Sequence, residues 1–426
     1  MSVQFPPSAA PLAAHPVDVL PAPVRSRLLE MARGADPVSA YVYDAEVAAG
    51  RARELRAALP DWAAVYYAVK ANSFPGIVRA LAPHVDGFEV ASVSELELAL
   101  EAAEFAATPA ENPAENPAEV PAVVAAGPAK SVPVLTPLVR ARVEAINAES
   151  LLELHRISRI AVAEGITARV ALRVNPADIP ISGSLHMGGA PSQFGVAEPD
   201  VPDVLAAAGK LPGLDIVGFH IHAASNNLDA DTHAAYLRWC VEWSVRTAAA
   251  TGIELRHIDI GGGIGVAFEG EAPFDMARFG ELTALVEPPV GVKVVLEPGR
   301  FLVADCGWYA AEVTDVKASY GEWFAVLRGG INHFQLPTSW DIVHNVAVLP
   351  VDAWDAGEEC PRPAAEHTRV TVVGELCTPE DTLLRDVYVE RVRAGDLVVF
   401  PNAGSYGWEF AMHAFLGHPV AGRQLL

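Results

Sequence analysis

The feature that most constrains the fold is a regular alternation of short apolar segments with longer, alanine-rich amphipathic segments. Short apolar runs rich in β-branched residues are typical of buried strands, and longer amphipathic segments are typical of helices. Eight strands are expected, at 65–70, 87–91, 122–126, 142–146, 169–174, 216–222, 257–260 and 292–296. This α/β pattern predicts a (β/α)8 TIM barrel. A doubly wound open sheet is the alternative, but no GxGxxG sequence follows the first strand.

The C-terminal part of the chain has a different pattern, in which helical periodicity is scarce. Short β-rich segments separated by turn residues recur there, at 309–320, 323–327, 368–373 and 397–400. This pattern predicts a C-terminal, mainly β domain over residues 306–426. The barrel is then expected over 38–305, after an N-terminal extension of residues 1–37. A strand expected at 38–43 belongs either to the barrel domain or to the β domain.

One segment interrupts the alternation of strands and helices. Residues 106–121 contain a tandem Glu-Asn-Pro-Ala repeat. A segment of this composition cannot bury a hydrophobic core, so we predict a disordered insertion ahead of the third strand that carries no chemistry. Deletion of the residues from Thr108 to Pro121 is expected to leave folding and activity nearly intact.

Composition excludes several classes of protein. The formal net charge is -23, from 53 acidic and 30 basic residues, so no net positive field exists to attract nucleic acid or an anionic membrane. The four cysteines form no CxxC pair, which indicates reduced thiols in a cytoplasmic protein. The N-terminus lacks the basic start and unbroken apolar core of a signal peptide, and no apolar run reaches transmembrane length.

Polar and glycine residues gather at the carboxyl ends of the expected strands, where a barrel enzyme has its active site. These residues are Lys70, Glu89, Ser92, Arg173, His222, Ser225, Gly261, Gly262, Gly263, Glu297, Gly299 and Arg300. Each has an ordinary structural explanation when taken alone, such as a solvated strand end, a core histidine or a tight turn. Their occurrence together at one mouth indicates an active site.

The residue types indicate a particular cofactor. The glycine run allows backbone N–H groups to close on an anion, Arg300 can add positive charge, and barrels often bind phosphate after their last two strands. A phosphate-bearing cofactor, a lysine that binds it covalently and an acid that tunes it describe pyridoxal 5'-phosphate. Lys70 would form the Schiff base, Glu297 would keep the pyridine nitrogen protonated, and His222 would stack on the ring. No metal site is predicted.

With these motifs in view, the sequence resembles the fold-type III pyridoxal-phosphate decarboxylases, the family of diaminopimelate and ornithine decarboxylases. The resemblance covers about residues 38–416. The matching barrel motifs are Tyr67-Ala68-Val69-Lys70-Ala71-Asn72, Gly87-Phe88-Glu89-Val90-Ala91-Ser92, Gly127-Pro128-Ala129-Lys130, Ile146-Asn147-Ala148-Glu149-Ser150, Leu172-Arg173-Val174-Asn175-Pro176, His220-Ile221-His222, Asp259 to Gly263 and Glu297 to Arg300. In the β domain, Gly374-Glu375-Leu376-Cys377 and Ala403-Gly404-Ser405-Tyr406-Gly407 match as well.

The resemblance implies an assembly and further site residues. The family forms head-to-tail homodimers with shared sites, so Cys377 is expected to reach the active site of the partner subunit. Tyr406, Ser225 and the three glycines at 261–263 are expected to hold the cofactor phosphate. Glu89, Arg173, Gly299 and Arg300 complete the expected cofactor-binding set. Lys70, Cys377, His222 and Glu297 are the expected catalytic residues.

Three departures from the family pattern stand out. The usual His-x-Gly-Ser reads His222-Ala223-Ala224-Ser225, so the extra methyl of Ala224 is expected to shift the phosphate loop slightly. Position 89 is Glu where many members have Asp. Thr378 replaces the acid that grips the substrate's distal amine in the two best-known branches, so a free distal ammonium would lose its charge partner.

The motif at 374–381, with Ser225-Asn226-Asn227 and the stretch 402–408, resembles the branch that serves siderophore assembly. That branch decarboxylates a diamino acid already coupled to citrate, and Cys377, Thr378 and Asp381 are the expected substrate-binding residues. Diaminopimelate or another diamino-acid decarboxylase is the alternative. A racemase is disfavoured because its pyridine nitrogen typically faces an arginine rather than an acid such as Glu297. A non-catalytic homologue often loses the lysine or the cysteine, and both are present here.

Overall fold

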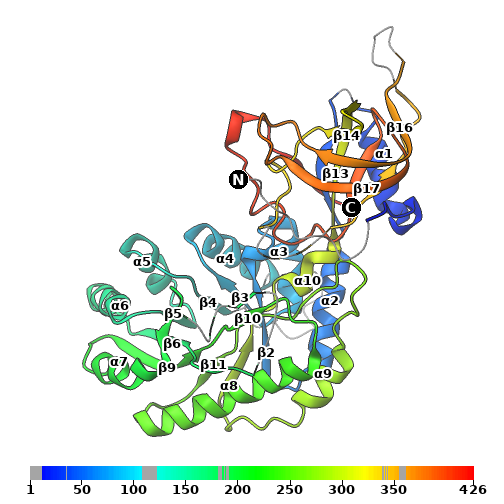
Figure 1. The fold of residues 1–426 in the computed structure, drawn as a ribbon. Helices are drawn as coiled ribbons and strands as arrows, with labels where there is room; N and C mark the ends of the chain where they lie inside the picture. Colours follow the sequence, from blue (N-terminus) through cyan, green and yellow to red (C-terminus); the bar gives the residue numbers. More distant parts are fainter. Residues whose placement is uncertain are drawn as a thin grey trace. The chain divides into compact units, whose positions relative to one another are not determined.

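The computed structural model describes residues 12–34, 36–107, 122–180, 185–186, 188, 191–337, 340, 342, 344–354 and 361–426. The chain forms two compact units, each built on a sheet of its own (Figure 1). The barrel unit consists of Ala48–Ala267 and Ala272–Leu302. The β unit consists of the described residues of Met1–Val47, Phe268–Glu271 and Val303–Leu426.

The barrel unit contains a closed ring of eight parallel strands. In order around the ring these are β2 (Ala63–Ala68), β3 (Gly87–Val90), β4 (Ala122–Ala125), β5 (Ala145–Ala148), β6 (Ala168–Asn175), β9 (Leu214–His220), β11 (His257–Asp259) and β12 (Lys293–Leu296). The ring closes where Leu296 of β12 pairs with Val65 of β2. This closure confirms the predicted barrel and rules out the open sheet, which would leave two unpaired edges.

All eight predicted strands are present, with bounds that differ from the prediction by a few residues at one or both ends, and two of these differences have a clear local cause or consequence. β2 ends at Ala68, so Lys70 lies in the short 3-10 helix η2 (Val69–Ala71) and not in the strand itself. β5 begins at Ala145 because Arg142 lies in the turn after the preceding helix, with a φ of 52° that no strand allows.

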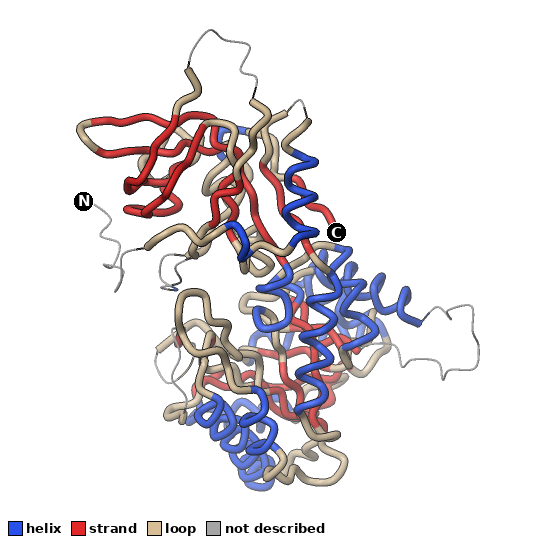
Figure 2. Tube along the Cα trace, turned by 90° about the vertical axis from the view of Figure 1, so that its right-hand side faces the viewer, coloured by secondary structure: helices blue, strands red, loops and turns tan. Residues whose placement is uncertain are grey.

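Helices surround the strands of the barrel unit (Figures 1 and 2). They are α2 (Ala45–Ala58), α3 (Pro75–Leu81), α4 (Val93–Ala107), α5 (Val132–Arg140), α6 (Leu151–Glu164), α7 (Val201–Ala208), α8 (Ala230–Thr251), α9 (Met276–Thr283) and α10 (Arg300–Val303). Local chemistry sets their ends. The Ser150 hydroxyl accepts from the Glu153 amide at 3.1 Å at the start of α6, and Gly165 ends α6 with a left-handed φ of 65°.

Part of the barrel interior is filled by an apolar cluster, in which Tyr66 is the largest side chain. The buried cluster is Ala64, Tyr66, Val124, Ala145, Ala171, Val217 and Val295. At the starts of the strands, Glu144 accepts hydrogen bonds from the Tyr66 hydroxyl (2.8 Å) and the Lys293 ammonium (2.9 Å). The His257 ring lies 3.6 Å from the same carboxylate. Because barrel enzymes place chemistry at the opposite end, this polar network is structural.

The β unit is built on an eight-stranded sheet. Its strands are β1 (Ser39–Tyr43), β13 (Gly307–Ser319), β14 (Glu322–Leu327), β15 (Ala347–Leu349), β16 (Ala364–Val373), β17 (Thr382–Arg393), β18 (Leu397–Phe400) and β19 (Gly422–Leu425). β1 pairs antiparallel with β13, with Tyr41 opposite Tyr309, and parallel with β19. Of the two placements that the sequence left open for 38–43, the structure shows the one in the β sheet.

Part of the predicted N-terminal extension packs into the core of the β unit. Val24 and Leu28 of α1 (Ala22–Met31) are fully buried in a cluster with Val42, Trp308 and Leu397. Helix α1, although it lies within the predicted extension, is therefore an integral element of this unit.

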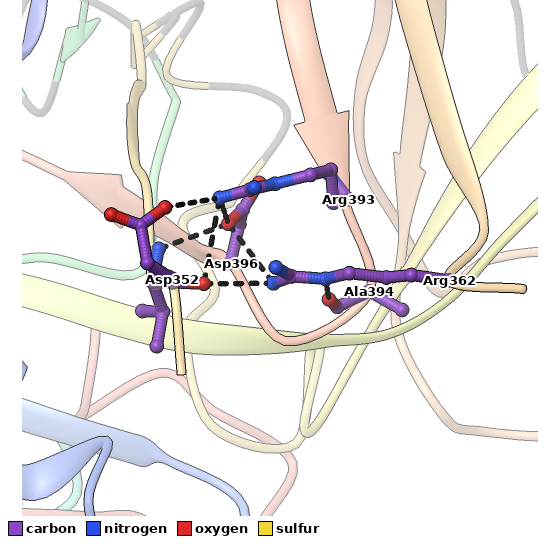
Figure 3. Close-up of polar contacts among 6 residues, drawn as sticks. Asp352, Arg362, Arg393, Ala394 and Asp396 are labelled. Carbon is purple, nitrogen blue, oxygen red and sulfur yellow. Dashed lines mark hydrogen bonds and ion pairs between the residues drawn. The ribbon is translucent and has the colours of Figure 1, made fainter. Parts of the chain in front are cut away.

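A buried carboxylate, Asp396, joins three further segments of the β unit. It accepts from the Val351 amide at 3.0 Å and from the guanidinium groups of Arg393 (2.9 Å) and Arg362 (3.3 Å) (Figure 3). These bonds satisfy a charge that would otherwise be costly to bury.

The predicted insertion falls mostly outside the described residues. Helix α4 continues to Ala107, so residues 106 and 107 belong to it and not to a loop. Residues 108–121, and the expected effect of deleting them, lie outside the part of the chain that the structure describes. Among the described residues, no helix is both long enough and apolar enough to cross a membrane.

Candidate active site

Lys70 lies at the carboxyl end of the barrel and contacts a buried acid. Its Nζ donates to Glu89 Oε2 at 2.6 Å, and Glu89, on β3, is fully buried. The Lys70 side chain remains 43 % exposed although Val69 and Ala71 on either side are buried. Burial raises the pKa of Glu89 to about 7, with the Lys70 ammonium opposing the shift and Glu297 adding to it. Glu89 can therefore gain or lose a proton near neutral pH.

The glycines after β11 form a tight turn against the His222 ring. The Gly262 amide donates to His222 Nδ1 at 3.2 Å, which places the ring proton of a neutral imidazole on Nε2. A Cβ added at Gly261 would lie 2.3 Å from that Nδ1, and one at Gly262 would lie 2.3 Å from the Glu297 carbonyl oxygen. No side chain fits in either place. Burial lowers the pKa of His222 to about 3, so the ring is neutral at working pH.

The loop that contains Ser225 adjoins the same glycine turn. The Asn227 amide donates to the Gly263 carbonyl at 2.8 Å, and the Gly265 amide donates to the Asn227 carbonyl at 2.8 Å. Ser225 itself is the second residue of the short strand β10 (Ala224–Ser225). The structure thus brings together two of the segments that the sequence predicted to hold phosphate, although they are far apart in the chain.

Glu297 follows β12 and is buried among polar side chains. Its Oε2 lies 3.6 Å from His220 Nε2, and one of its oxygens lies within 4.8 Å of an oxygen of Asp259. Burial alone would raise the pKa of Glu297, but His220 and Lys70 outweigh it and lower the value, so Glu297 is ionised. Its buried Oε1 has no hydrogen-bond partner among the described residues. Gly299 and Arg300, also buried, follow it at the start of α10.

Arg173 is committed to a buried ion pair. Its Nη1 donates to Glu149 Oε1 at 2.7 Å, both side chains are nearly inaccessible, and the guanidinium lies 4.7 Å from the Phe194 ring centroid. Its positive charge helps to keep His222 neutral, and direct contact with a cofactor stays a prediction.

Ser92 has a local function at the start of a helix. Its hydroxyl accepts from the Glu95 amide at 3.2 Å where α4 begins. This bond satisfies one of the amides that a helix leaves without an internal partner at its first turn. Ser92 therefore caps α4, and nothing in its contacts directs it to the mouth of the barrel.

Several polar residues lie inside the barrel, and the sequence analysis gave them no role. Asn147 Nδ2 donates to Asp259 Oδ2 at 3.2 Å, and the Lys130 ammonium donates to the Asn147 carbonyl at 2.9 Å while pairing with Glu153 at 2.8 Å. His220 lies beside Asp259 in the same interior. A signal did exist in the sequence, because a polar residue inside an apolar strand, as Asn147 is in Ala-Ile-Asn-Ala, is seldom buried without a partner.

The remaining predicted residues belong to the β unit. Cys377 is exposed and Thr378 half-buried in the loop between β16 and β17. Asp381, at the end of that loop, is 3 % exposed, and its two oxygens accept from the amides of Ile331 (2.8 Å) and Leu376 (2.7 Å). This geometry favours a role in positioning the loop over the predicted contact with substrate.

Tyr406 lies in the turn after β18 with a left-handed φ of 63°. Its ring packs edge-on against Trp340, with 5.0 Å between centroids, and near Phe410, at 6.0 Å. A positive φ in a bulky residue is uncommon and often marks a position that function constrains. Its predicted contact with the cofactor phosphate stays a prediction.

Comparison with known proteins decides the family. Residues 47–304 match the model of the pyridoxal-binding domain of pyridoxal-dependent decarboxylases. The chain belongs to this family. It is 36 % identical over 396 residues to a Staphylococcus aureus 2-[(L-alanin-3-ylcarbamoyl)methyl]-2-hydroxybutanedioate decarboxylase, covering 90 % of this chain and 92 % of the relative. It is 31 % identical over 378 residues to the diaminopimelate decarboxylase of Aquifex aeolicus, covering 88 % and 83 %.

The fold is shared with solved structures of the family. The Helicobacter pylori diaminopimelate decarboxylase complexed with L-lysine superposes with a TM-score of 0.78, covering 94 % of this decarboxylase and 93 % of that chain at 24 % identity. At this identity the likeness shows the fold alone. It places the protein among barrels that carry a separate, mainly β domain, as the sequence predicted.

The residues at the mouth fit pyridoxal 5'-phosphate, the cofactor of this family. The buried and unpartnered Glu297 Oε1 is an acceptor suited to a protonated pyridine nitrogen. The glycine turn presents backbone where no side chain fits, as close approach of a phosphate requires. The Lys70 amine remains accessible at the same mouth. When bound, the cofactor supplies an electron-withdrawing ring that accepts the electron pair released on loss of a carboxylate.

Proposed function

We propose that this decarboxylase removes the α-carboxylate of a diamino acid whose distal nitrogen is already coupled to citrate, as a step of siderophore biosynthesis. The observation that carries the proposal is the likeness to the Staphylococcus aureus enzyme. The name of that enzyme describes a citrate skeleton joined by an amide to the 3-position of an alanine unit. The distal nitrogen of such a substrate is an uncharged amide.

The chemistry of the loop at 374–381 supports this substrate class. Thr378, which is half-buried, offers a hydroxyl and no charge at the position where the resemblance led us to expect an acid. A free distal ammonium would find no countercharge from that residue, whereas an amide nitrogen needs none. The carboxylates of citrate would be repelled by an acid and are not repelled by threonine.

We assign the residues of the mouth as follows. Lys70 binds the cofactor covalently and Glu297, being ionised, holds a proton on the pyridine nitrogen. The neutral ring of His222 lies against the cofactor ring. Glu89, Arg173, Ser225, the glycines at 261–263, Gly299, Arg300 and Tyr406 complete the cofactor site. Cys377 and Thr378 meet the substrate, and Asp381 holds their loop.

We further propose that the enzyme is a cytoplasmic homodimer in which Cys377 completes the site of the partner subunit. An exposed cysteine in a short loop held by a buried Asp381 is suited to reach a second chain. The same unit exposes several large apolar side chains near its C-terminus, namely Phe410, Met412, Phe415, Leu416 and Val420. Exposed large apolar side chains are commonly covered at a protein–protein interface.

Diaminopimelate decarboxylation is the second candidate, because several relatives have that activity, including the Aquifex aeolicus enzyme. The lack of charge at Thr378 weighs against it, since diaminopimelate carries a free distal amino group. A racemase is disfavoured by the ionised Glu297, and a non-catalytic homologue by the presence of Lys70 and Cys377.

Release of carbon dioxide from a panel of substrates tests the proposal. The panel contains citrate-coupled 2,3-diaminopropionate, citrate-coupled ornithine, the two free diamino acids and diaminopimelate. We expect kcat/KM to be highest for a citrate-coupled substrate. The Glu297→Gln protein serves as a control for cofactor-dependent turnover. Preference for diaminopimelate would establish the second candidate, and absence of turnover with every substrate would count against both.

A further inference from the structure

Two carboxyl groups lie close together inside the barrel. Asp259 ends β11 and is fully buried, and Glu297 follows β12 and is 5 % exposed. One oxygen of each, together with a ring nitrogen of His220, lie within 4.8 Å of one another. Two carboxylates cannot both stay ionised at such a distance in a dry interior. A hydrogen bond between two carboxyl groups also requires that one of them carries the proton.

We propose that Asp259 is a positioning residue that carries this proton and donates it to Glu297, so that Glu297 keeps one oxygen, Oε1, available and ionised for the cofactor. The inference rests on the proposed role of Glu297 toward the pyridine nitrogen. The residues on either side of Asp259 in the chain, Ile258 and Ile260, have no hydrogen-bond donor in their side chains and cannot donate a proton to Glu297.

The surroundings of the two carboxyls decide which of them is ionised. Glu297 faces His220 at 3.6 Å and is influenced by the Lys70 ammonium, both of which favour its charged form. Burial raises the pKa of Asp259 well above its usual range, and the negative charge of Glu297 raises it further. The Gly261 amide and Asn147 oppose this shift without reversing it. The proton therefore belongs to Asp259.

Asn147 and Gly261 hold the orientation of the Asp259 carboxyl. The Gly261 amide donates to Asp259 Oδ1 at 2.8 Å, which leaves Oδ2 as the donor toward Glu297. Asn147 Nδ2 lies 3.2 Å from Oδ2. The buried Asn147 Oδ1 has no partner among the described residues. The Asn147 amide group can therefore rotate by about 180° and accept a hydrogen bond from position 259 through Oδ1. An asparagine at position 259 would then be able to make every bond that a protonated aspartic acid makes.

The test compares Asp259→Asn with Asp259→Ala. Asparagine keeps a donor toward Glu297, and alanine removes it. The dissociation constant of pyridoxal 5'-phosphate is measured by titrating each apo-protein, after verifying its fold by circular dichroism. We expect Asp259→Asn to bind within about threefold of wild type and Asp259→Ala to bind about tenfold or more weakly, the value of a hydrogen bond to a charged group. Equal weakening in both variants would overturn the proposal, because it would mean that the native residue acts as an anion.

Infrared spectroscopy of the wild-type apo-protein provides a second readout that depends on neither cofactor nor turnover. A protonated, buried carboxyl has a carbonyl stretching band separate from the carboxylate bands, and the band shifts in D2O. We expect such a band at neutral pH and its loss in Asp259→Asn. Absence of this band in the wild type would refute the proposal, even if Asp259→Ala did not fold.

Two control variants show whether the effect is specific to the carboxyl pair. Asp215→Asn alters an aspartate at the opposite end of β9 that pairs with Arg256, and should leave cofactor affinity unchanged. If Glu297→Gln decarboxylated its substrate at the wild-type rate, the proposed ring-nitrogen role would fail, whereas the infrared result would stand.

A metal ion is the competing occupant of this group of residues. His220, Asp259 and Glu297 have the donor types of a metal site. Dialysis of the purified protein against a chelator, followed by elemental analysis and cofactor titration, distinguishes the two. Unchanged cofactor affinity would support the shared proton. Loss of a bound divalent ion together with loss of cofactor affinity would overturn it.

Discussion

Lys70 and Glu89 form a hydrogen bond of 2.6 Å between an accessible ammonium and a fully buried carboxylate. The contact follows from strand order, because Ala68, the last residue of β2, pairs directly with Glu89 on β3. The acid holds the amine at the mouth of the barrel. Since the pKa of Glu89 is raised to about 7, it can take up a proton at neutral pH when the ammonium moves away. The pair is thus suited to a lysine whose amine must leave the Glu89 carboxylate in order to bind the cofactor.

Lys70→Ala is expected to abolish covalent cofactor binding and to lower turnover by at least about a thousandfold, because Lys70 supplies the amine that is proposed to bind the cofactor. Lys70→Arg is the matched control, since it keeps a cation beside Glu89 but cannot bind the cofactor covalently. The visible absorbance of bound cofactor, its loss on borohydride treatment, and carbon dioxide release are the measurements. Turnover like that of the wild type in either variant would refute the cofactor assignment.

Glu297→Gln should still bind cofactor but should lose rate, because a neutral amide cannot hold the proton of the pyridine nitrogen. We expect kcat to fall by about a hundredfold or more, the scale of one lost electrostatic contact in the transition state. Single-turnover decarboxylation measures the step directly. An unchanged rate would show that the ring nitrogen does not depend on this residue.

Thr378→Glu should shift specificity toward substrates with a free distal amine. A carboxylate there would attract an ammonium and repel the carboxylates of a coupled citrate. The ratio of kcat/KM for coupled over free substrate should fall by about tenfold or more. Thr378→Gln, which is similar in size to Glu but uncharged, controls for bulk. If the charged and the neutral variant changed the ratio equally, charge at this position would not select the substrate.

Mixing two inactive variants tests the shared site. If Cys377 completes the partner's site, Lys70→Ala and Cys377→Ala should each be nearly inactive, and subunit exchange should restore activity. In a mixed dimer one site contains both substitutions and the other contains neither. With random exchange of equal amounts, half of the dimers are mixed and half of their sites are intact, so about a quarter of wild-type activity should return. If Cys377 is only a small apolar residue, Cys377→Ala stays active. Absence of rescue after verified exchange would place both residues in the site of one chain.

Glu144→Gln should reduce stability at neutral pH but not in acid. Burial alone would raise the pKa of Glu144, but the nearby His257 ring and the hydrogen bonds from Lys293 and Tyr66 outweigh it and lower the value to about 2. A carboxyl with a depressed pKa in the folded state stabilises above its unfolded value of about 4.3, and this contribution is lost as the pH falls toward 2. It amounts to about 3 kcal/mol at neutral pH.

Urea unfolding of wild type and Glu144→Gln between pH 7 and pH 3 measures this effect. The difference between their unfolding midpoints should shrink steadily below about pH 4.5. Glu164→Gln is the control, because Glu164 pairs with Arg140 on the surface, where an ion pair contributes little. A difference that stays constant with pH would show that Glu144 is not ionised in the folded protein or acts only through packing.

The amino-acid sequence by itself determined the barrel, its eight strands and the polar residues at their carboxyl ends. Those features depend on local patterns: apolar runs of strand length, alanine-rich helices, and residues such as Lys70 and Glu297 that closely follow a strand. In a parallel barrel, a position just after a strand is enough to place a side chain at the mouth. The motifs at the strand ends, together with that around Cys377, were also sufficient to indicate the family.

Only the tertiary structure decided which distant residues meet. Asn147 and Asp259 are 112 positions apart and touch because ring closure brings their strands together around one interior. β1 pairs with β13 and β19, which follow it in the chain only after the whole barrel. No local sequence pattern could therefore place β1 in the β sheet. Asp381 holds a loop because its backbone partners come from two separate turns. Contacts of this kind depend on three-dimensional closure, which local sequence patterns do not encode.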